Sequence, residues 1–209
     1  MDRTVLRIDT GMSWMRFLRG RGEVTRVGML RALYWSALYR VALLDLESLA
    51  ARLVADLSGD SEDEMIEKCR TWHELAVGHH VAPAARRAID AHRESGDVIV
   101  LLTGSTQYAA CVVADSLDIE HVLCSRLEVS GGRFTGRMAQ LCFGDYKVFL
   151  AESFAGQQGV DLNDSWFYSD SYNDLPMLRR VGRAVAVNPD PRLRRHASRA
   201  GWRIENWDA

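Results

Sequence analysis

Three short polar segments of this sequence carry side chains suited to phosphate chemistry. Thr103 and Gly104 precede an expected helix, where a hydroxyl and free backbone N–H groups can hold phosphate oxygens. Asp170 and Asp174 stand four residues apart, and carboxylate oxygens are the ligands that hard cations prefer. Lys147 offers an ammonium group for a phosphoryl oxygen or for a carboxylate. These residue types predict a site that binds a phosphate group together with a cation.

Each of these segments, taken alone, also has a structural explanation. Thr103 is a suitable helix N-cap, Asp170 and Asp174 suit caps or solvated charges, and most lysines such as Lys147 are surface residues. Their joint occurrence favours function, because all three segments fall at the same edge of one predicted sheet. In parallel sheets the ligand site lies at the carboxyl ends of the strands.

The elements that would position these residues change in type near residue 81. Residues 12–81 show apolar positions at helical spacing and no convincing strand. Beyond them helices alternate with apolar runs such as 98–102 and 165–169, which are typical of buried parallel strands, and residues 127–135 indicate a hairpin with a glycine-rich turn. The alternation predicts an α/β fold with a parallel sheet, helices on both of its faces and a helical insertion.

Composition restricts the class of protein. The 209 residues have a formal net charge of −2, which argues against nucleic-acid binding. The four cysteines have no C-x-x-C spacing and indicate a reducing compartment, so we expect a cytoplasmic protein. The apolar stretch 27–44 contains Arg31 and Arg40 on opposite helix faces, which makes a membrane span unlikely and leaves an interfacial role as a minor alternative. Small-molecule binding by a monomer or homodimer is the expectation.

Together the segments resemble the haloacid-dehalogenase (HAD) superfamily, in the branch similar to phosphoserine phosphatase (subfamily IB). Residues 170–178 match its D-x-x-x-D turn and the Leu-Pro-Met-Leu that follows, and residues 185–189 match the next strand. The resemblance covers essentially the whole chain. It implies a Rossmann-like core of residues 1–11 and 82–209, with an all-helical cap of residues 12–81.

The family's first motif, an apolar strand followed by D-x-D-x-T, is matched only in its second half. Asp2, Arg3 and Thr4 align with its D-x-T, so the nucleophilic aspartate and its strand are expected just upstream of Met1. The chain as given is therefore expected to be nearly inactive. A start assigned at an internal methionine and a true pseudoenzyme are the two explanations.

The resemblance implies a magnesium-dependent (Mg²⁺) phosphatase that hydrolyses a small, phosphoserine-like phosphomonoester through an aspartyl-phosphate. Asp2 would protonate the leaving alcohol and then activate water, with its backbone carbonyl contacting the metal. Asp170 would bind Mg²⁺, and Asp174 would orient the ligands around it.

The phosphoryl oxygens are assigned, by the same resemblance, to Thr103 and Lys147, with Gly104 adding a backbone N–H group. Arg3 replaces the commoner glycine of the motif and is a candidate contact to substrate or cap.

Substrate-selecting residues are expected from the cap and its entry. Asp9 also ends an apolar stretch, but Gly11 stands where the motif needs its second carboxylate, so we assign Asp9 to the cap-entry loop. Arg16 is a further candidate, whereas Trp14 and Trp35 fit a core better. His79 and His80 are interpreted as hinge or surface residues.

Two other classes of function remain open. A non-catalytic phosphate-binding or regulatory HAD-like module is expected if no nucleophile precedes Met1 in the cell, and the upstream genomic sequence would distinguish the two. A receiver-like domain shares Asp, Thr and Lys chemistry, but the long helical insertion and the late D-x-x-x-D turn count against it.

Overall fold

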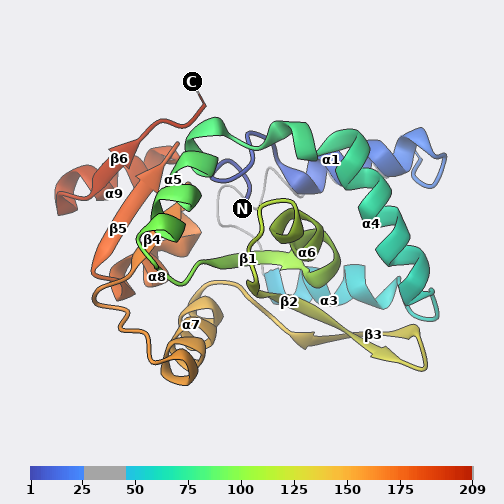
Figure 1. The fold of residues 1–209 in the computed structure, drawn as a ribbon. Helices are drawn as coiled ribbons and strands as arrows, with labels where there is room; N and C mark the ends of the chain where they lie inside the picture. Colours follow the sequence, from blue (N-terminus) through green and yellow to red (C-terminus); the bar gives the residue numbers. More distant parts are fainter. Residues whose placement is uncertain (26–45, 209) are drawn as a thin grey trace.

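Strands and helices alternate after residue 83 in the computed structural model, which describes residues 1–25 and 46–208 (Figure 1). The helix predicted over residues 27–44, with Trp35 in it, lies outside the described residues. The longer helices are α1 (Thr10–Gly20), α3 (Leu46–Ala55), α4 (Glu62–Ala76), α5 (Pro83–Glu94), α6 (Gln107–Asp115), α7 (Asp145–Gln158), α8 (Leu175–Arg180) and α9 (Pro191–Ala200). Two short 3₁₀ helices are η1 (Gly78–His80) and η2 (Tyr172–Asp174).

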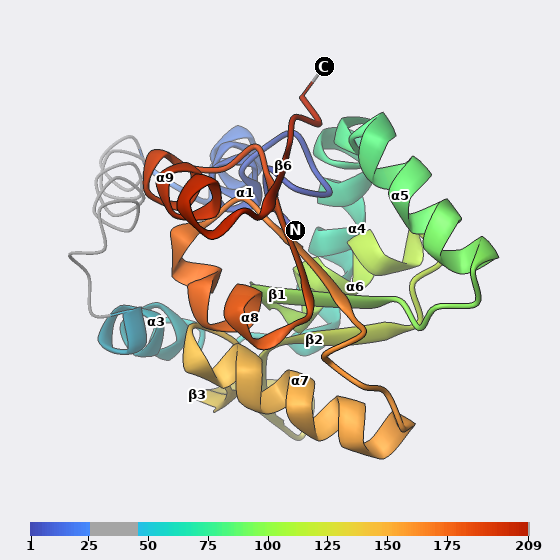
Figure 2. The same ribbon diagram turned by 90° about the vertical axis from the view of Figure 1, so that its left-hand side faces the viewer.

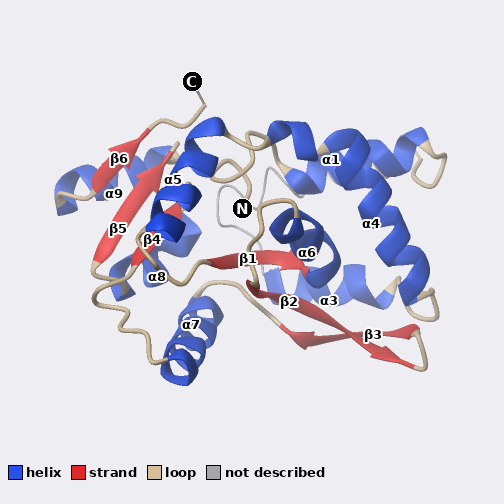
Figure 3. Cartoon of the chain, viewed as in Figure 1, coloured by secondary structure: helices blue, strands red, loops and turns tan. Residues whose placement is uncertain are grey.

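The strands confirm the predicted α/β class. They are β1 (Val100–Thr106), β2 (His121–Ser130), β3 (Arg133–Gln140), β4 (Trp166–Ser169), β5 (Arg183–Val187) and β6 (Arg203–Glu205). β1 runs parallel to β2, and β4, β5 and β6 form a parallel set, while β2 and β3 are antiparallel. Figure 3 shows helices lying over the strands of both groups.

The strands form two three-stranded sheets where the sequence predicts one. Their orders are β1-β2-β3 and β4-β5-β6, so β1 and β4 are edge strands and no described strand joins them. Both edges face the region where the N-terminal segment lies in Figure 1. Apolar spacing locates each strand because it reflects burial, but it does not show which strands are neighbours.

The hairpin extends further than its sequence pattern indicates. β2 is continuous from His121 to Ser130, where the sequence suggests two short strands, and the chain turns at Gly131 and Gly132 with φ angles of 58° and 73°. These positive φ values are the left-handed region that glycine enters at little cost. The register shifts near Leu127 explain the break in the apolar pattern.

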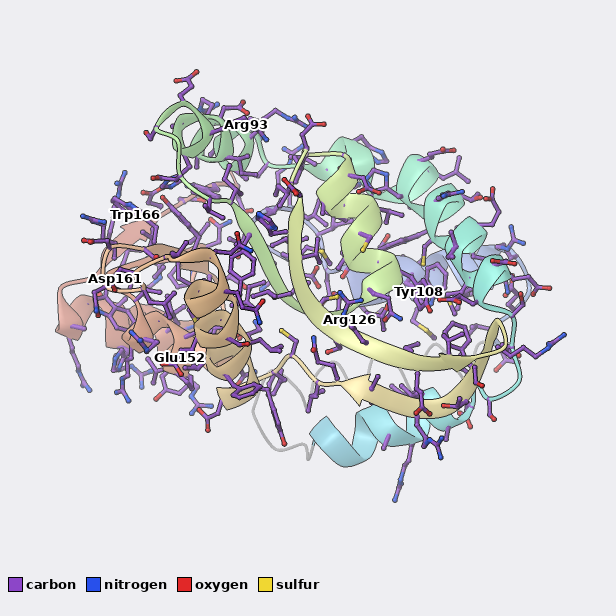
Figure 4. The ribbon with its side chains drawn as sticks, turned by 60° about the horizontal axis from the view of Figure 1, so that its bottom comes forward. Arg93, Tyr108, Arg126, Glu152, Asp161 and Trp166 are labelled. Atoms are coloured by element: carbon purple, nitrogen blue, oxygen red, sulfur yellow. The ribbon has the colours of Figure 1, made fainter. Side chains whose placement is uncertain are left out.

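The helices before residue 81 pack against this hairpin. Phe134 of β3 exchanges backbone hydrogen bonds with the turn after α3, accepting from Gly59 N at 2.9 Å and donating to Asp60 O at 3.0 Å. Tyr108 on α6 stacks edge-to-face on Phe134 and donates from its hydroxyl to Glu62 of α4 at 2.8 Å (Figure 4). One apolar cluster is thus shared by the two segments predicted as core and cap.

The largest apolar cluster lies around the N-terminal segment. Leu6, Trp72 and Val77 are almost completely buried together with residues of α6 and β1. Trp72 Nε1 donates to Ser13 Oγ at 3.1 Å and its ring meets Trp14 edge-to-face, which confirms Trp14 as a packing residue. α1 and α4 therefore lie side by side, as Figure 2 also shows. No described helix is long and apolar enough to cross a membrane.

Replacing Phe134 should destabilise the protein strongly. Phe134→Ala removes a ring that is 3% exposed and leaves a cavity beneath Tyr108, so we expect the free energy of unfolding to fall by about 3–5 kcal/mol. Urea unfolding followed by circular dichroism measures the change. Leu75→Ala is the control, because that side chain is 68% exposed, and equal losses for both variants would contradict the assigned packing.

Candidate active site

The turn after β4 has a hydrogen-bond network of its own. Ser169, the last residue of β4, accepts at Oγ from Ser171 N at 3.2 Å, and Ser171 Oγ accepts from Asn173 N at 3.2 Å. These bonds fold the chain back into η2, which brings Asp170 and Asp174 to the same end of the strand. These local bonds shape the turn, and Asp190 also holds it by accepting from Tyr172 N at 2.6 Å and donating from its own N–H to Asp170 O at 2.8 Å.

Lys147 and Asp174 form a buried ion pair between α7 and this turn. Lys147 Nζ lies 2.6 Å from Asp174 Oδ1, and the residues are 6% and 9% exposed. The other oxygen, Asp174 Oδ2, accepts from Ser169 Oγ at 2.7 Å. Burial by itself raises the pKa of Asp174, but Lys147 and Ser169 outweigh it and the pKa is lowered. The carboxylate is thus held ionised, and it fixes the direction of the lysine.

Thr103 and Gly104 lie in an irregular part of β1. The pairing with β2 shifts between Thr103 and Thr106, and Thr103 Oγ1 accepts from Ser105 N at 3.3 Å. A Cβ at position 104 would lie 3.3 Å from the carbonyl oxygen of Cys142, which explains the glycine there. The strand extends four residues past the predicted end at 102, so the polar segment belongs to a bulged strand and not to the helix start.

Asp2 is held by the first residue of α1. Its carboxylate accepts from Thr10 N at 3.1 Å and from Thr10 Oγ1 at 2.8 Å. Burial raises its pKa, with Asp9 adding to the effect and the Met1 amino group and Thr10 opposing it. A raised pKa suits a carboxyl group that donates a proton.

Asp170 experiences the charge of the other two carboxylates. Burial raises its pKa to about 6, and Asp174 and Asp2 add to the shift while the Met1 amino group lowers it. The same amino group lowers the pKa of Asp174 and of Asp2. Asp170 and Asp174 lie at the end of β4, and burial is the main cause of the raised pKa of both Asp170 and Asp2.

The donors at this place fit a magnesium ion. Asp170 offers a carboxylate and Asp2 a backbone carbonyl, and both residues are partly buried, while Lys147 pairs with Asp174. Across the part of the chain that the structure describes, no three His, Cys, Asp or Glu side chains form a complete ligand set. Mg²⁺ is commonly held by one or two carboxylates, with water and phosphate oxygens completing its shell, so the residues present suffice.

Several residues of this site were not among the sequence predictions. Ser169 and Thr10 hold the two aspartates, as described above. Asn188, after β5, donates from Nδ2 to the carbonyl of Arg3 at 2.9 Å and accepts at Oδ1 from Trp207 N at 2.8 Å. Asp190 caps α9 and also accepts from Tyr172 N at 2.6 Å. The positions of Asn188 and Asp190 shortly after a strand could have indicated them, because polar residues at the carboxyl ends of strands face the ligand site.

The remaining predicted residues line a pocket that begins at Arg3, the residue after Asp2. Arg3, with φ 51°, and Arg16 line a cavity together with His79 and His80. Asp9 also lines it and caps α1 by accepting from Met12 N at 2.9 Å. The structure thus places Arg3 beside the predicted cap-entry residues, and its contact to substrate stays a prediction.

Comparison with known proteins identifies the family that the chain matches. The model of the haloacid dehalogenase-like hydrolases matches residues 1–179. A histidinol-phosphatase of Neisseria meningitidis is 27% identical, covering 99% of this chain and 96% of that protein. A phosphoserine phosphatase of Mycobacterium tuberculosis is 29% identical, covering 99% of this chain and 69% of the relative.

Solved structures share the fold. A Bordetella pertussis protein of unknown function superposes with a TM-score of 0.88 at 27% identity, covering 98% of this chain and 95% of the other. A substrate-bound phosphoserine phosphatase superposes with a TM-score of 0.73 at 19% identity, covering 99% and 89%. At 19% identity the likeness concerns the fold.

Removing one partner of the buried ion pair should lower the free energy of unfolding far more than replacing both partners. Asp174→Ala leaves the Lys147 ammonium buried without its partner, so we expect the free energy of unfolding to fall by about 3–5 kcal/mol. The double variant Lys147→Met, Asp174→Leu should lose much less than the sum of the single changes. Urea unfolding of the unmodified protein, Lys147→Met, Asp174→Leu and the double variant gives the cycle.

The exposed pair of Glu128 and Arg137 supplies the control, and Glu128→Ala should leave the midpoint of unfolding nearly unchanged. Strictly additive losses at Lys147 and Asp174 would mean that the two side chains do not stabilise each other.

Proposed function

We propose that this chain, which belongs to the haloacid dehalogenase-like hydrolase family, hydrolyses small phosphomonoesters of the phosphoserine type with the help of Mg²⁺. The observation that carries the proposal is the buried Lys147–Asp174 pair beside Asp170 and Asp2. It offers a fixed cation for phosphoryl oxygens and two carboxylates for a metal and a proton. Sequence relatives named as phosphatases of two different phosphate esters support the reaction class.

The phosphoryl group would be held between Lys147 and Thr103. Asp174 directs the Lys147 ammonium at 2.6 Å, so this ammonium would meet oxygens whose negative charge grows in the transition state. The Thr103 hydroxyl and the backbone of Gly104 lie on the bulged end of β1. Such donors accelerate the reaction because they are already in place and need not move as the transition state forms.

Asp2 would act as the general acid and then as the general base. Its raised pKa keeps a proton available to the leaving alcohol, and Thr10 holds the carboxyl group in place. After the alcohol leaves, the same carboxylate can take a proton from the water that attacks the phosphoenzyme. Asp170, with the Asp2 carbonyl, would hold the magnesium ion, which offsets charge between nucleophile and phosphate when bound.

The attacking carboxylate is proposed at the motif position two residues before Asp2, so that an aspartyl-phosphate forms there. Two observations support this placement. Asn188, after β5, donates to the Arg3 carbonyl at 2.9 Å, so the backbone beside Asp2 lies at the carboxyl ends of the strands. β1 and β4 are also both sheet edges, and a strand leading to that position would have a place between them.

Activity should depend on that position and on Asp170. We expect the chain extended by its genomic upstream residues to release phosphate from a panel of phosphomonoesters with Mg²⁺. EDTA should abolish release, and Asp170→Asn should reduce kcat/KM about a hundredfold or more, because a carboxylate ligand is lost. The unextended chain should be nearly inactive. Malachite-green detection of phosphate measures all four.

Asp164→Asn is the matched control, since Asp164 is an exposed aspartate that pairs with Arg183 away from the site. Metal-dependent turnover by the unextended chain would contradict the placement of the nucleophile. A folded, extended protein that hydrolyses no ester would favour a non-catalytic phosphate-binding module.

A further inference from the structure

A second place on the molecule combines positive charge with apolar lining residues. A cavity of about 670 Å³ lies between the first seventeen residues and the segment that ends in η1. Its rim carries five basic side chains, namely Arg3, Arg7, Arg16, His79 and His80. Of these five residues, the sequence marks Arg3 and Arg16 as candidate contacts to substrate or cap, and Arg7 has had no role until here.

The two walls of this cavity are tied together by the backbone. Arg7 N donates to His80 O at 2.9 Å, and Leu6 forms a bridge with Val81. On the other side Ser13 Oγ donates to Ala76 O at 3.4 Å. The spacing of the two segments that form the pocket is therefore held by hydrogen bonds between them.

The positive charges around the cavity are not neutralised by their own protein. Within the described residues, Arg3, Arg7 and Arg16 form no ion pair with an acidic side chain. Asp9 is the single acidic residue among the lining residues. Burial lowers the pKa of His80, and the charges of His79 and Arg7 lower it further. The three arginines therefore supply the positive charge of this cavity, and a bound anion would offset it.

The cavity also has apolar lining residues. These are Ile8, Met12, Phe17 and Ala76. A site for a bare inorganic ion needs no such surface, whereas an organic molecule gains affinity by covering it. The combination fits a ligand with one acidic group and a compact apolar body.

We propose that this cavity binds a small organic anion, whose phosphate or carboxylate group meets the arginines while its apolar part lies against Ile8, Met12 and Phe17. Arginine suits the acidic group because its planar guanidinium donates two parallel hydrogen bonds to such oxygens. The anion has two possible sources, namely a second acidic group on the ester being hydrolysed and a separate effector. The first source rests on the proposed function, and binding itself does not.

Calorimetry with phenylphosphonate tests binding, in the presence of EDTA and in a Thr103→Val background, so that neither a metal ion nor the Thr103 hydroxyl holds the probe at the proposed active site. We expect the double variant Arg7→Gln, Arg16→Gln to bind at least tenfold more weakly than the Thr103→Val protein. Arg19→Gln is the matched control, because Arg19 lies on the same helix and does not line the cavity, and its affinity should be unchanged. Both arginines of the double variant are exposed, so it should fold, which circular dichroism verifies.

The body of the ligand is tested by comparing probes. Inorganic phosphate should bind at least tenfold more weakly than phenylphosphonate, and equal affinities would overturn the organic character of the ligand. Unchanged phenylphosphonate binding in the double variant would overturn the site itself.

The source of the anion is tested with 4-phosphonobenzoate and Mg²⁺. If the pocket receives part of the substrate, both Thr103→Val and the double variant should weaken binding of this two-ended probe. If it receives a separate effector, the double variant alone should do so. Weakening by Thr103→Val alone would overturn the proposal, while the proposed phosphatase activity would stand.

Discussion

A lysine ammonium that is almost completely withdrawn from water constrains the chemistry of this fold. Lys147 comes from α7 and its partner Asp174 from the turn after β4, so the two elements must meet to within a hydrogen bond. A buried charge without a partner is costly, and its pairing therefore excludes alternative positions of α7. Ser169 completes the arrangement by satisfying the second oxygen of the carboxylate. Positioning and charge are consequently fixed by the same three side chains.

The acidic groups next to this pair are the other feature on which function depends. Burial raises the pKa of the carboxyl groups of both Asp2 and Asp170. Stability alone would favour fewer acidic groups in such a place, and strained electrostatics of this kind concentrate at functional sites. A cation and a phosphate group together would balance the charges, which connects the geometry to the proposed reaction.

The helices that precede residue 81 are joined to the α/β part by a common apolar cluster. Val54 and Cys69 come from these helices, while Tyr108, Leu127 and Phe134 come from α6 and the hairpin. The long β2–β3 hairpin reaches out from its sheet to provide this contact. The basic cavity lies at the opposite end of the same helices, where the chain enters and leaves them. Any shift of the helices against the hairpin would therefore alter that cavity.

The sequence by itself determined the class of fold and the chemical types at the site. Apolar periodicity located nearly all the described elements, since burial on one face leaves a regular spacing along the chain. The two aspartates of residues 170–174 were recognisable because their turn is built from local hydrogen bonds.

Tertiary structure decided which of these groups touch. That Lys147 meets Asp174, that Thr10 holds Asp2 and that Asn188 binds the Arg3 carbonyl depends on segments far apart along the chain. The division into two sheets and the basic cavity likewise follow from how elements are placed in space. Local spacing carries no information on such contacts, because they are selected by the packing of the whole chain.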